Sequence, residues 1–431
     1  MTQALAPQAI VVSVGEELLE GRVLDTNAQL LAGELLRLGF VVQRFLTIGD
    51  APAAFQDLLA EYAGRADAIV SSGGLGPTAD DRVRAEAAAA AGVALVDVPD
   101  ALPQLAELYR RQLHTEPPDH YLAQARVPAG ALPLPNHAGT AWGFAQSLGP
   151  RTRLVCLPGP PREAAACFFD GGGRADLAAR VSAGRRLAFG TFHTAGWTES
   201  AVEGRIRDLL ERSGNPRMGI IASGRRVTVS VLACDEPGCS AIELLEATAT
   251  QLRTRLGEIL WGRDDETLEG VAVRILAERG QTVATAESCT GGRLAAALTA
   301  IPGASDVFRY GWITYADAAK TSELGVPAEL LRGAGAVSPE TAIAMAEGAR
   351  RKASADWALS ITGIAGPGGG SAEKPVGLVW IGVAGPQGSY AVRRRMFARA
   401  GRAAVQEQSV RDALEALRRE LLGLNRLPDR G

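Results

Sequence analysis

Short apolar runs that end in glycine-rich turns alternate with amphipathic stretches through residues 1–170. Four runs have the composition of buried strands: residues 9–15, 40–49, 66–74 and 151–161. Residues 26–39 have the spacing of an amphipathic helix that stops at Gly39. This alternation is typical of βαβ units around a mostly parallel sheet. Because ligands of open α/β sheets lie at the carboxyl ends of strands, the glycine-rich breaks predict where a site lies.

Two further units follow, so the sequence predicts a multidomain α/β protein. A glycine-rich stretch from Asp170 reads as a domain edge. Residues 171–264 have room only for a small α+β module, with strands at 187–196 and 225–234 and a helix at 199–212. We expect this module to be a spacer or a dimerisation unit. Residues 265–431 again mix helices with strand-like runs and close with a helix at 406–423.

Composition limits the classes of function. The net charge of −3 lacks the basic field that binding to a phosphate backbone requires, so direct nucleic-acid binding is not expected. No stretch approaches the ~20 apolar residues of a membrane span, and the start of the chain lacks a signal-peptide pattern. Five cysteines are few and odd in number, which argues against a disulfide framework. We therefore expect a cytoplasmic protein that has no membrane partner.

Lysine is rare in this chain. Only three of the 45 basic residues are lysines: Lys320, Lys352 and Lys374. A buried lysine can lose its proton and act as a base, whereas arginine cannot. Lys352 lies among arginines and reads as a solvated surface residue, but Lys320 and Lys374 lie within motif-like segments.

The C-terminal unit carries a group of residues that could act on a carbonyl. The strand at 282–288 ends in Glu-Ser-Cys-Thr-Gly-Gly, a turn that can expose a nucleophile and direct N–H groups at an oxyanion. The plainer interpretation is that Ser288 or Thr290 only caps the next helix. Other hydroxyl, glycine and lysine positions follow along the chain: Tyr315, Lys320, Ser338, Thr362, Gly363, Gly366 and Lys374. Serine with lysine and tyrosine is one way to activate a hydroxyl without histidine.

These motifs, TAESCTGG, YADAAK, GAVS and TGIAGP followed by KPVG, resemble the C-terminal domain of the CinA family and its stand-alone PncC-type relatives. The resemblance implies an α/β/α fold and the conversion of nicotinamide mononucleotide to nicotinate mononucleotide and ammonia, with no cofactor. It makes Ser288 the nucleophile, Lys320 its base and Tyr315 the assisting hydroxyl. Cys289 is the rival nucleophile. The substrate-binding residues expected around them are Thr290, Gly291 and Gly292 as oxyanion donors, together with Ser338, Thr362, Gly363 and Gly366.

The N-terminal unit has its own set of polar residues at strand ends. Glu17 follows the first strand and Asn27 begins a helix, while Gly74, Gly76 and Thr78 precede Asp80 and Asp81. Glycines allow a phosphate to approach the backbone, and paired carboxylates can hold a hard divalent cation. Adjacent aspartates are, however, more often simple capping charges of a helix.

Four segments together, SVGEELLEGRVLDTN, GGLGPTADD, PNHAGTAWGF and LPGPPRE, resemble the CinA N-terminal domain, which is related to the MoaB/MogA molybdopterin-binding fold. The resemblance implies an α/β/α domain that splits ADP-ribose with a divalent metal ion. The site would include Glu17, Asn27, Gly74, Gly76, Thr78, Pro158 and Gly159, with Asp80 and Asp81 at the metal. The chain departs from the usual pattern at Glu16, His137, Ala138, Trp142 and Arg162, which changes polarity near the expected phosphate path.

Two other interpretations stay open from the sequence. The N-terminal domain could bind a molybdopterin, as its fold relatives do. The protein could also act without catalysis, through a protein partner in recombination or competence. A homodimer is the common arrangement for soluble enzymes, and we expect one here.

Overall fold

The computed structural model describes residues 6–429 except 182–185, 213, 224–225 and 397–400. The chain divides into two compact units, Met1–Phe189 with Leu232–Leu245, and Gly190–Val231 with Glu246–Gly431. The fold class predicted from the sequence, a multidomain α/β protein, is confirmed. Within the described residues, no helix combines the length and the apolar character needed to cross a bilayer.

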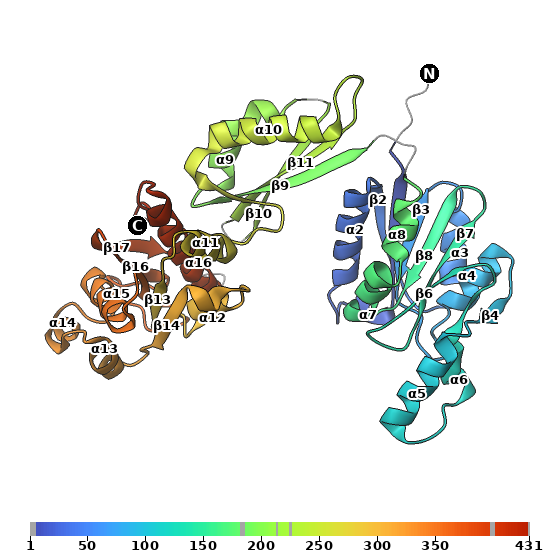
Figure 1. Ribbon diagram of the computed structural model, residues 1–431, viewed down its shortest axis with the longest axis horizontal. Coiled ribbons are helices and arrows are strands. Elements are labelled where there is room, and N and C mark those ends of the chain that lie inside the picture. Colours follow the sequence, from blue (N-terminus) through green and yellow to red (C-terminus); the bar gives the residue numbers. More distant parts are fainter. Residues whose placement is uncertain (1–5, 182–185, 213, 224–225, 397–400, 430–431) are drawn as a thin grey trace. The chain divides into compact units, whose positions relative to one another are not determined.

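The N-terminal domain is a six-stranded sheet with helices on both faces (Figure 1). Its strand order is β2-β1-β3-β8-β7-β6; the first four strands are parallel, and β7 and β6 are added antiparallel. The strands are β1 (Gln8–Val14), β2 (Val41–Ile48), β3 (Ala68–Ser72), β6 (Leu132–Leu134), β7 (Gly143–Leu148) and β8 (Thr152–Leu157). A separate antiparallel pair is formed by β4 (Leu95–Asp97) and β5 (Arg126–Pro128).

Successive side chains of β1 enter apolar cores on opposite faces of the sheet, so helices cover both faces. Ile10 and Val12 enter one apolar core with Phe55 of α3, whereas Val11 enters the other with Leu31 of α2. The helices are α1 (Glu16–Leu19), α2 (Thr26–Leu38), α3 (Ala54–Tyr62), α4 (Val83–Ala91), α5 (Ala101–Leu113), α6 (Asp119–Leu122), α7 (Pro161–Ala165) and α8 (Gly173–Ala178).

The middle segment forms a small sheet of order β10-β11-β9-β12. Alternate residues of β11, among them Val227, Val229 and Val231, are buried, as a strand with one covered face requires. The elements are β9 (Leu187–Ala195), α9 (Glu199–Leu210), β10 (Arg217–Ser223), β11 (Arg226–Cys234), α10 (Ala241–Leu256) and β12 (Leu260–Arg263). The sequence predicted β9, α9 and β11 but not β10 or β12.

The C-terminal domain has a five-stranded sheet of order β14-β13-β15-β16-β17. The first three strands are parallel, and the β16–β17 hairpin continues the sheet antiparallel. The strands are β13 (Val283–Glu287), β14 (Phe308–Ile313), β15 (Trp357–Gly363), β16 (Leu378–Gly385) and β17 (Gly388–Arg395). Helices α11 (Leu268–Glu278), α12 (Arg293–Thr299) and α16 (Gly401–Leu422) pack on one face, and α13 (Asp317–Leu324), α14 (Ala328–Gly333) and α15 (Pro339–Ala353) on the other (Figure 1).

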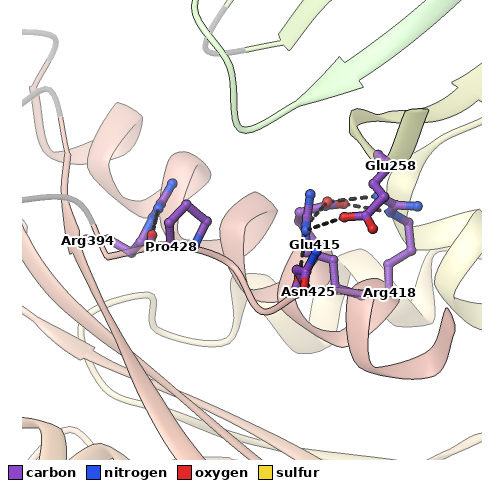
Figure 2. A network of polar contacts seen from close by, with 7 residues as sticks. Glu258, Arg394, Glu415, Arg418, Asn425 and Pro428 are labelled. Carbon is purple, nitrogen blue, oxygen red and sulfur yellow. Dashed lines mark hydrogen bonds and ion pairs between the residues drawn. The ribbon is translucent and has the colours of Figure 1, made fainter. Parts of the chain in front are cut away.

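Helix α16 contributes apolar side chains to the core. It also carries a cluster of buried ion pairs (Figure 2). The Glu415 carboxylate accepts hydrogen bonds from Arg418 Nε and Nη2 at 2.7 and 2.8 Å and from Arg419 Nε at 2.9 Å. Arg418 Nη2 also donates to the Glu258 carbonyl at 2.7 Å, and Arg419 Nη1 to the Asn425 carbonyl at 2.6 Å. This cluster ties α16 to the segment that precedes β12.

Candidate active site at the carboxyl ends of β13, β14 and β15

A pocket of about 270 Å³ lies where the three parallel strands of the C-terminal sheet end. Its walls come from segments far apart in the sequence: the turn after β13, the β14–α13 connection, the loop before α15, the loop after β15 and the start of α16. The lining residues are Ser288, Cys289, Tyr315, Asp317, Lys320, Ala336, Val337, Thr362, Gly363, Ile364, Ala365, Gly366, Gly368, Gly369 and Arg402. The three predicted catalytic residues therefore share one pocket.

Hydrogen bonds to the Glu287 carboxylate stabilise the turn that carries Ser288. This carboxylate is fully buried and accepts hydrogen bonds from the N–H groups of Gly292, Leu294 and Ala295 at 2.8–3.1 Å. It therefore caps the start of α12 and occupies the end of that helix where an anion would otherwise bind. The side chain of Ser288 then faces the pocket from a rigid turn.

The predicted oxyanion donors need correction. The Gly292 N–H is bound to Glu287, and the Gly291 N–H donates to the Ser288 carbonyl at 3.2 Å. Neither glycine lines the pocket, and Thr290 is buried and is not a lining residue either. Both glycines have positive φ, so the turn itself is the reason for glycine at these positions.

Lys320 is almost completely buried, with 1% of its surface exposed. Its ammonium donates to the carbonyl of Tyr315 at 3.4 Å and to Asp317 Oδ1 at 3.2 Å. Both acceptors lie on the segment that carries the lysine, and Ser288 is not among the hydrogen-bond partners described for it. Lys320 and Ser288 line one pocket, as the sequence predicted. The ion pair between Lys320 and Asp317 was not predicted.

The environment of Cys289 disfavours it as the nucleophile. Burial raises the pKa of its thiol to about 12, so the reactive thiolate is scarce at neutral pH. Gln406 of α16 donates to the Cys289 carbonyl at 2.7 Å and thereby holds the same turn from the other side. Ser288 remains the better candidate.

Arg402 is a pocket residue that the sequence analysis missed. Its Nη1 donates to the Gly366 carbonyl at 3.0 Å and its Nη2 to the Tyr315 hydroxyl at 2.9 Å. No motif marks Arg402, because it reaches the pocket from a helix that starts after the last strand of the domain. A guanidinium at this position can bind a phosphate or a carboxylate with two parallel hydrogen bonds.

The remaining predicted residues divide into two groups. Thr362, Gly363 and Gly366 line the pocket; the Thr362 hydroxyl donates to the Ala336 carbonyl at 2.7 Å, so it ties two walls together. Gly366 has a φ of +82°, and a Cβ there would lie 2.5 Å from Val376. Ser338, by contrast, caps α15 by accepting from the Thr341 N–H, and it does not line the pocket.

In the N-terminal domain, the glycine-rich loop after β3 borders a larger pocket of about 620 Å³. Gly76, Thr78 and Asp81 line it, and Asp81 accepts from the N–H and the hydroxyl of Thr78 at 2.9 and 2.5 Å. The floor includes Arg84, whose guanidinium donates to two backbone carbonyls. Its burial lowers its pKa to about 10. His120 and Arg126 of the opposite wall were not predicted.

Other predicted residues of this domain lie at the strand ends. Asn27 Nδ2 donates to the Gly159 carbonyl at 2.7 Å, which joins α2 to the Pro158–Pro160 loop. Burial, with the nearby charges of Asp80, Glu17 and Glu16, raises the pKa of Asp50. Asp50 follows β2 and lies outside the motifs that predicted Glu17 and Asp80.

The carboxylates of this domain offer the oxygen ligands that hard cations prefer. Among the described residues, however, no three His, Cys, Asp or Glu side chains converge closely enough to hold a metal ion. Asp81 is engaged by Thr78, and a hydrogen bond from Thr78 lowers the pKa of Asp80. Metal binding by Asp80 and Asp81 stays a prediction.

Comparisons with known proteins match nearly all of the chain. Family models described as "CinA C-terminal domain", "Probable molybdopterin binding domain" and "Damage-inducible protein CinA KH domain" match residues 265–421, 10–170 and 190–262. A competence-damage inducible protein of Symbiobacterium thermophilum is 41% identical over 96% of this chain and 99% of its own length. A CinA-like protein of Synechococcus sp. CC9902 is 41% identical over 96% of this chain and 98% of its own.

Among solved structures, the competence/damage inducible protein CihA of Agrobacterium tumefaciens is 47% identical to the part it matches. The match covers 35% of this chain and 93% of that protein, with a TM-score of 0.33.

Proposed function

Because this chain belongs to the CinA family, we propose that its C-terminal domain hydrolyses the carboxamide of nicotinamide mononucleotide to nicotinate mononucleotide and ammonia. The observation that carries the proposal is the gathering of Ser288, Tyr315 and Lys320 in one pocket that also holds the guanidinium of Arg402. A hydroxyl, a buried amine and a cation are what the hydrolysis of an amide on a phosphorylated substrate requires.

The reaction follows from these groups in two halves. Ser288 Oγ attacks the carboxamide carbon while its proton passes to the neutral amine of Lys320. The C–N bond then breaks, and the nitrogen leaves as ammonia after taking that proton from Lys320. Water hydrolyses the acyl-serine ester, with Lys320 accepting a proton from water and returning it to the serine. No cofactor is needed for these steps.

Arg402 and Tyr315 are assigned to the substrate rather than to proton transfer. The guanidinium is joined to the Tyr315 hydroxyl, and both groups face the pocket. We assign Arg402 to the 5′-phosphate, because a guanidinium pairs with phosphate through charge-assisted hydrogen bonds. The hydroxyl of Tyr315 can then orient the carboxamide or the lysine.

The test is direct. Purified protein is incubated with nicotinamide mononucleotide, and ammonia and nicotinate mononucleotide are measured for the wild type and for S288A, K320A and C289A. The proposal expects turnover that S288A and K320A abolish and that C289A retains, with all variants folded. Activity that is lost in C289A but kept in S288A would identify the thiol as the nucleophile, and no turnover in the wild type would refute the proposal.

For the N-terminal domain we propose a second activity, the metal-dependent hydrolysis of the pyrophosphate of ADP-ribose. The supporting observation is the pocket of about 620 Å³ beside the glycine-rich loop, with the buried cation of Arg84 at its floor. A bound divalent cation would neutralise pyrophosphate charge there, and Asp81 of the pocket wall, with the adjacent Asp80, would hold it. Release of AMP from ADP-ribose with and without Mg²⁺ tests this activity.

The same domain could instead bind a molybdopterin, as the description of its family model suggests. Thermal protection separates the two ligands. ADP-ribose should raise the melting temperature of the N-terminal transition, and a molybdopterin should not. Protection by the molybdopterin alone would reverse the assignment.

We further propose that the protein is a homodimer, which light scattering on the purified chain will test. The KH description of the middle segment raises a nucleic-acid role. KH domains clamp RNA with a Gly-x-x-Gly loop, and residues 190–262 contain no two glycines at that spacing. A role through a protein partner in competence or recombination is the remaining non-enzymatic alternative, and it predicts a wild-type protein without amidase turnover.

A further inference from the structure

Lys374 belongs to a motif of the C-terminal domain, but the proposed reaction does not use it. It lies in the loop between β15 and β16, where four of the nine residues 366–374 are glycines. Its Nζ donates a hydrogen bond to the Ala334 carbonyl, 40 residues away in the sequence, at 2.8 Å. A Cβ on Gly335 would lie 3.2 Å from the same nitrogen. Lys374 therefore joins the glycine-rich loop to the loop that precedes α15.

Residues 334–336, in the loop before α15, offer three consecutive backbone carbonyls to side chains. Lys374 binds the first of them, and the Thr362 hydroxyl donates to the third at 2.7 Å. The second accepts from the Ser338 and Thr341 hydroxyls at 3.1 and 2.8 Å. Side chains from the end of β15, from the start of α15 and from the glycine-rich loop thus hold one short segment.

Both joined loops border the candidate active site. Ala336 and Val337 line its pocket, and so do three glycines of the loop that carries Lys374. One of these glycines, Gly366, accepts a hydrogen bond from Arg402 Nη1 at 3.0 Å through its carbonyl. Because glycine has more backbone freedom than other residues, a loop of this composition depends on contacts with its neighbours for a fixed shape.

We propose that Lys374 is a positioning residue for substrate binding. Its hydrogen bond to Ala334 keeps the glycine-rich loop beside the loop before α15, and the Gly366 carbonyl of that loop in turn keeps Arg402 in place. The part of this inference that concerns the substrate rests on the proposed function, in which Arg402 binds the 5′-phosphate.

The reacting groups are held by contacts that do not involve Lys374. The turn of Ser288 is stabilised by Glu287. Lys320 donates to two acceptors of its own segment. A substitution that raises KM and leaves kcat unchanged has removed binding energy that ground state and transition state share. Removal of the Lys374 donor should therefore weaken the binding of the substrate and leave the rate of the chemical step nearly unchanged.

Hydrogen–deuterium exchange of the full-length protein, measured without substrate, tests the tie between the loops. K374M removes the donor and keeps an unbranched side chain. We expect faster exchange in the peptides that cover residues 333–338 and 364–377. K352M is the matched control, because Lys352 is exposed and donates to the Ser322 carbonyl, and neither residue lines the pocket. Equal exchange of these peptides in K374M and in the wild type would overturn the inference, whatever the activity of the protein.

Steady-state kinetics with nicotinamide mononucleotide test the consequence for binding. K374M should raise KM by about tenfold and change kcat by less than about twofold, as the loss of one hydrogen bond that orders the binding site allows. K374R keeps a donor and should recover most of the affinity, and K352M should match the wild type. A fall in kcat with KM unchanged, or a K374R variant as impaired as K374M, would overturn the inference. Absence of turnover in the wild type would refute the proposed function, whereas the exchange measurement still decides the tie.

Discussion

Glu415 is the acceptor at the centre of the buried ion cluster on α16, and its replacement by alanine tests whether burial sets the strength of that cluster. The side chains of Glu415, Arg418 and Arg419 are 2%, 3% and 8% exposed. The substitution removes three hydrogen bonds of 2.7–2.9 Å and leaves two buried guanidinium groups without their carboxylate. Breaking a buried ion pair from one side destabilises a protein by about 3–5 kcal/mol.

The surroundings place the expected loss at the lower end of that range. Arg418 keeps its hydrogen bond to the Glu258 carbonyl, and Arg419 keeps that to the Asn425 carbonyl. The partly exposed carboxylate of Glu258, 3.4 Å from Arg419 Nη1, also retains some compensation of charge. We therefore expect E415A to lower the free energy of unfolding of the C-terminal unit by about 3 kcal/mol.

Urea unfolding measures this loss, with the transition of the C-terminal unit identified by the disappearance of the proposed amidase activity. The matched control is E278A, because Glu278 pairs with Arg274 at i,i+4 spacing on a helix of the same unit, with both side chains more than half exposed. The control should lose no more than about 0.5 kcal/mol. Equal losses in E415A and E278A would refute the argument that burial makes the difference.

Three further predictions concern the two sites. E287Q should lower the free energy of unfolding of the C-terminal unit by about 1–3 kcal/mol and lower kcat, because an amide NH₂ would face the N–H groups at the start of α12. Urea unfolding and the turnover of nicotinamide mononucleotide measure the two effects. R402K should raise KM for nicotinamide mononucleotide by roughly tenfold with a smaller change in kcat, because a lysine cannot reproduce the two-pronged contact. D50N should raise the melting temperature of the N-terminal domain at about pH 7 but not at about pH 2. The folded state holds the Asp50 proton to higher pH than the unfolded chain, so stability falls as pH rises from the ordinary aspartate pKa of ~3.9 through the raised one. E61Q on the neighbouring exposed helix face is its control, and a melting temperature unchanged in D50N would contradict the effect.

Much of the fold could be predicted because each domain builds a sheet whose central strands are buried on both faces. The strand expected at 9–15 is β1 (Gln8–Val14), and the helix expected at 26–39 is α2 (Thr26–Leu38). Strands without such a pattern were missed. None of the six residues of β14 is fully buried: four are exposed and two partly buried, without alternation, because β14 is the edge strand of the sheet. Neither a continuous apolar run nor a period of two marks such a strand.

The residues of the candidate site also divide into those that could be predicted from the sequence and one, Arg402, that could not. Ser288 follows β13, Lys320 lies on the helix after β14, and Thr362 lies at the end of β15. These positions come together because parallel strands bring their carboxyl ends to one edge of the sheet. Arg402 follows the antiparallel hairpin, whose strands run in both directions, so its position along the chain says nothing about that edge. Sequence spacing locates groups that the sheet itself assembles, and it does not locate a group that a covering helix adds.

The hydrogen bonds of the site explain why a resemblance in motifs cannot by itself establish a mechanism. The motif YADAAK supplies a lysine, but the fold decides that this lysine is buried and that its carboxylate partner is Asp317. The motif TAESCTGG supplies glycines, but the fold commits their N–H groups to Glu287 and to the Ser288 carbonyl. In both segments the residue type matches the proposed chemistry, while the protonation of the base and the source of the oxyanion donors depend on contacts made in three dimensions.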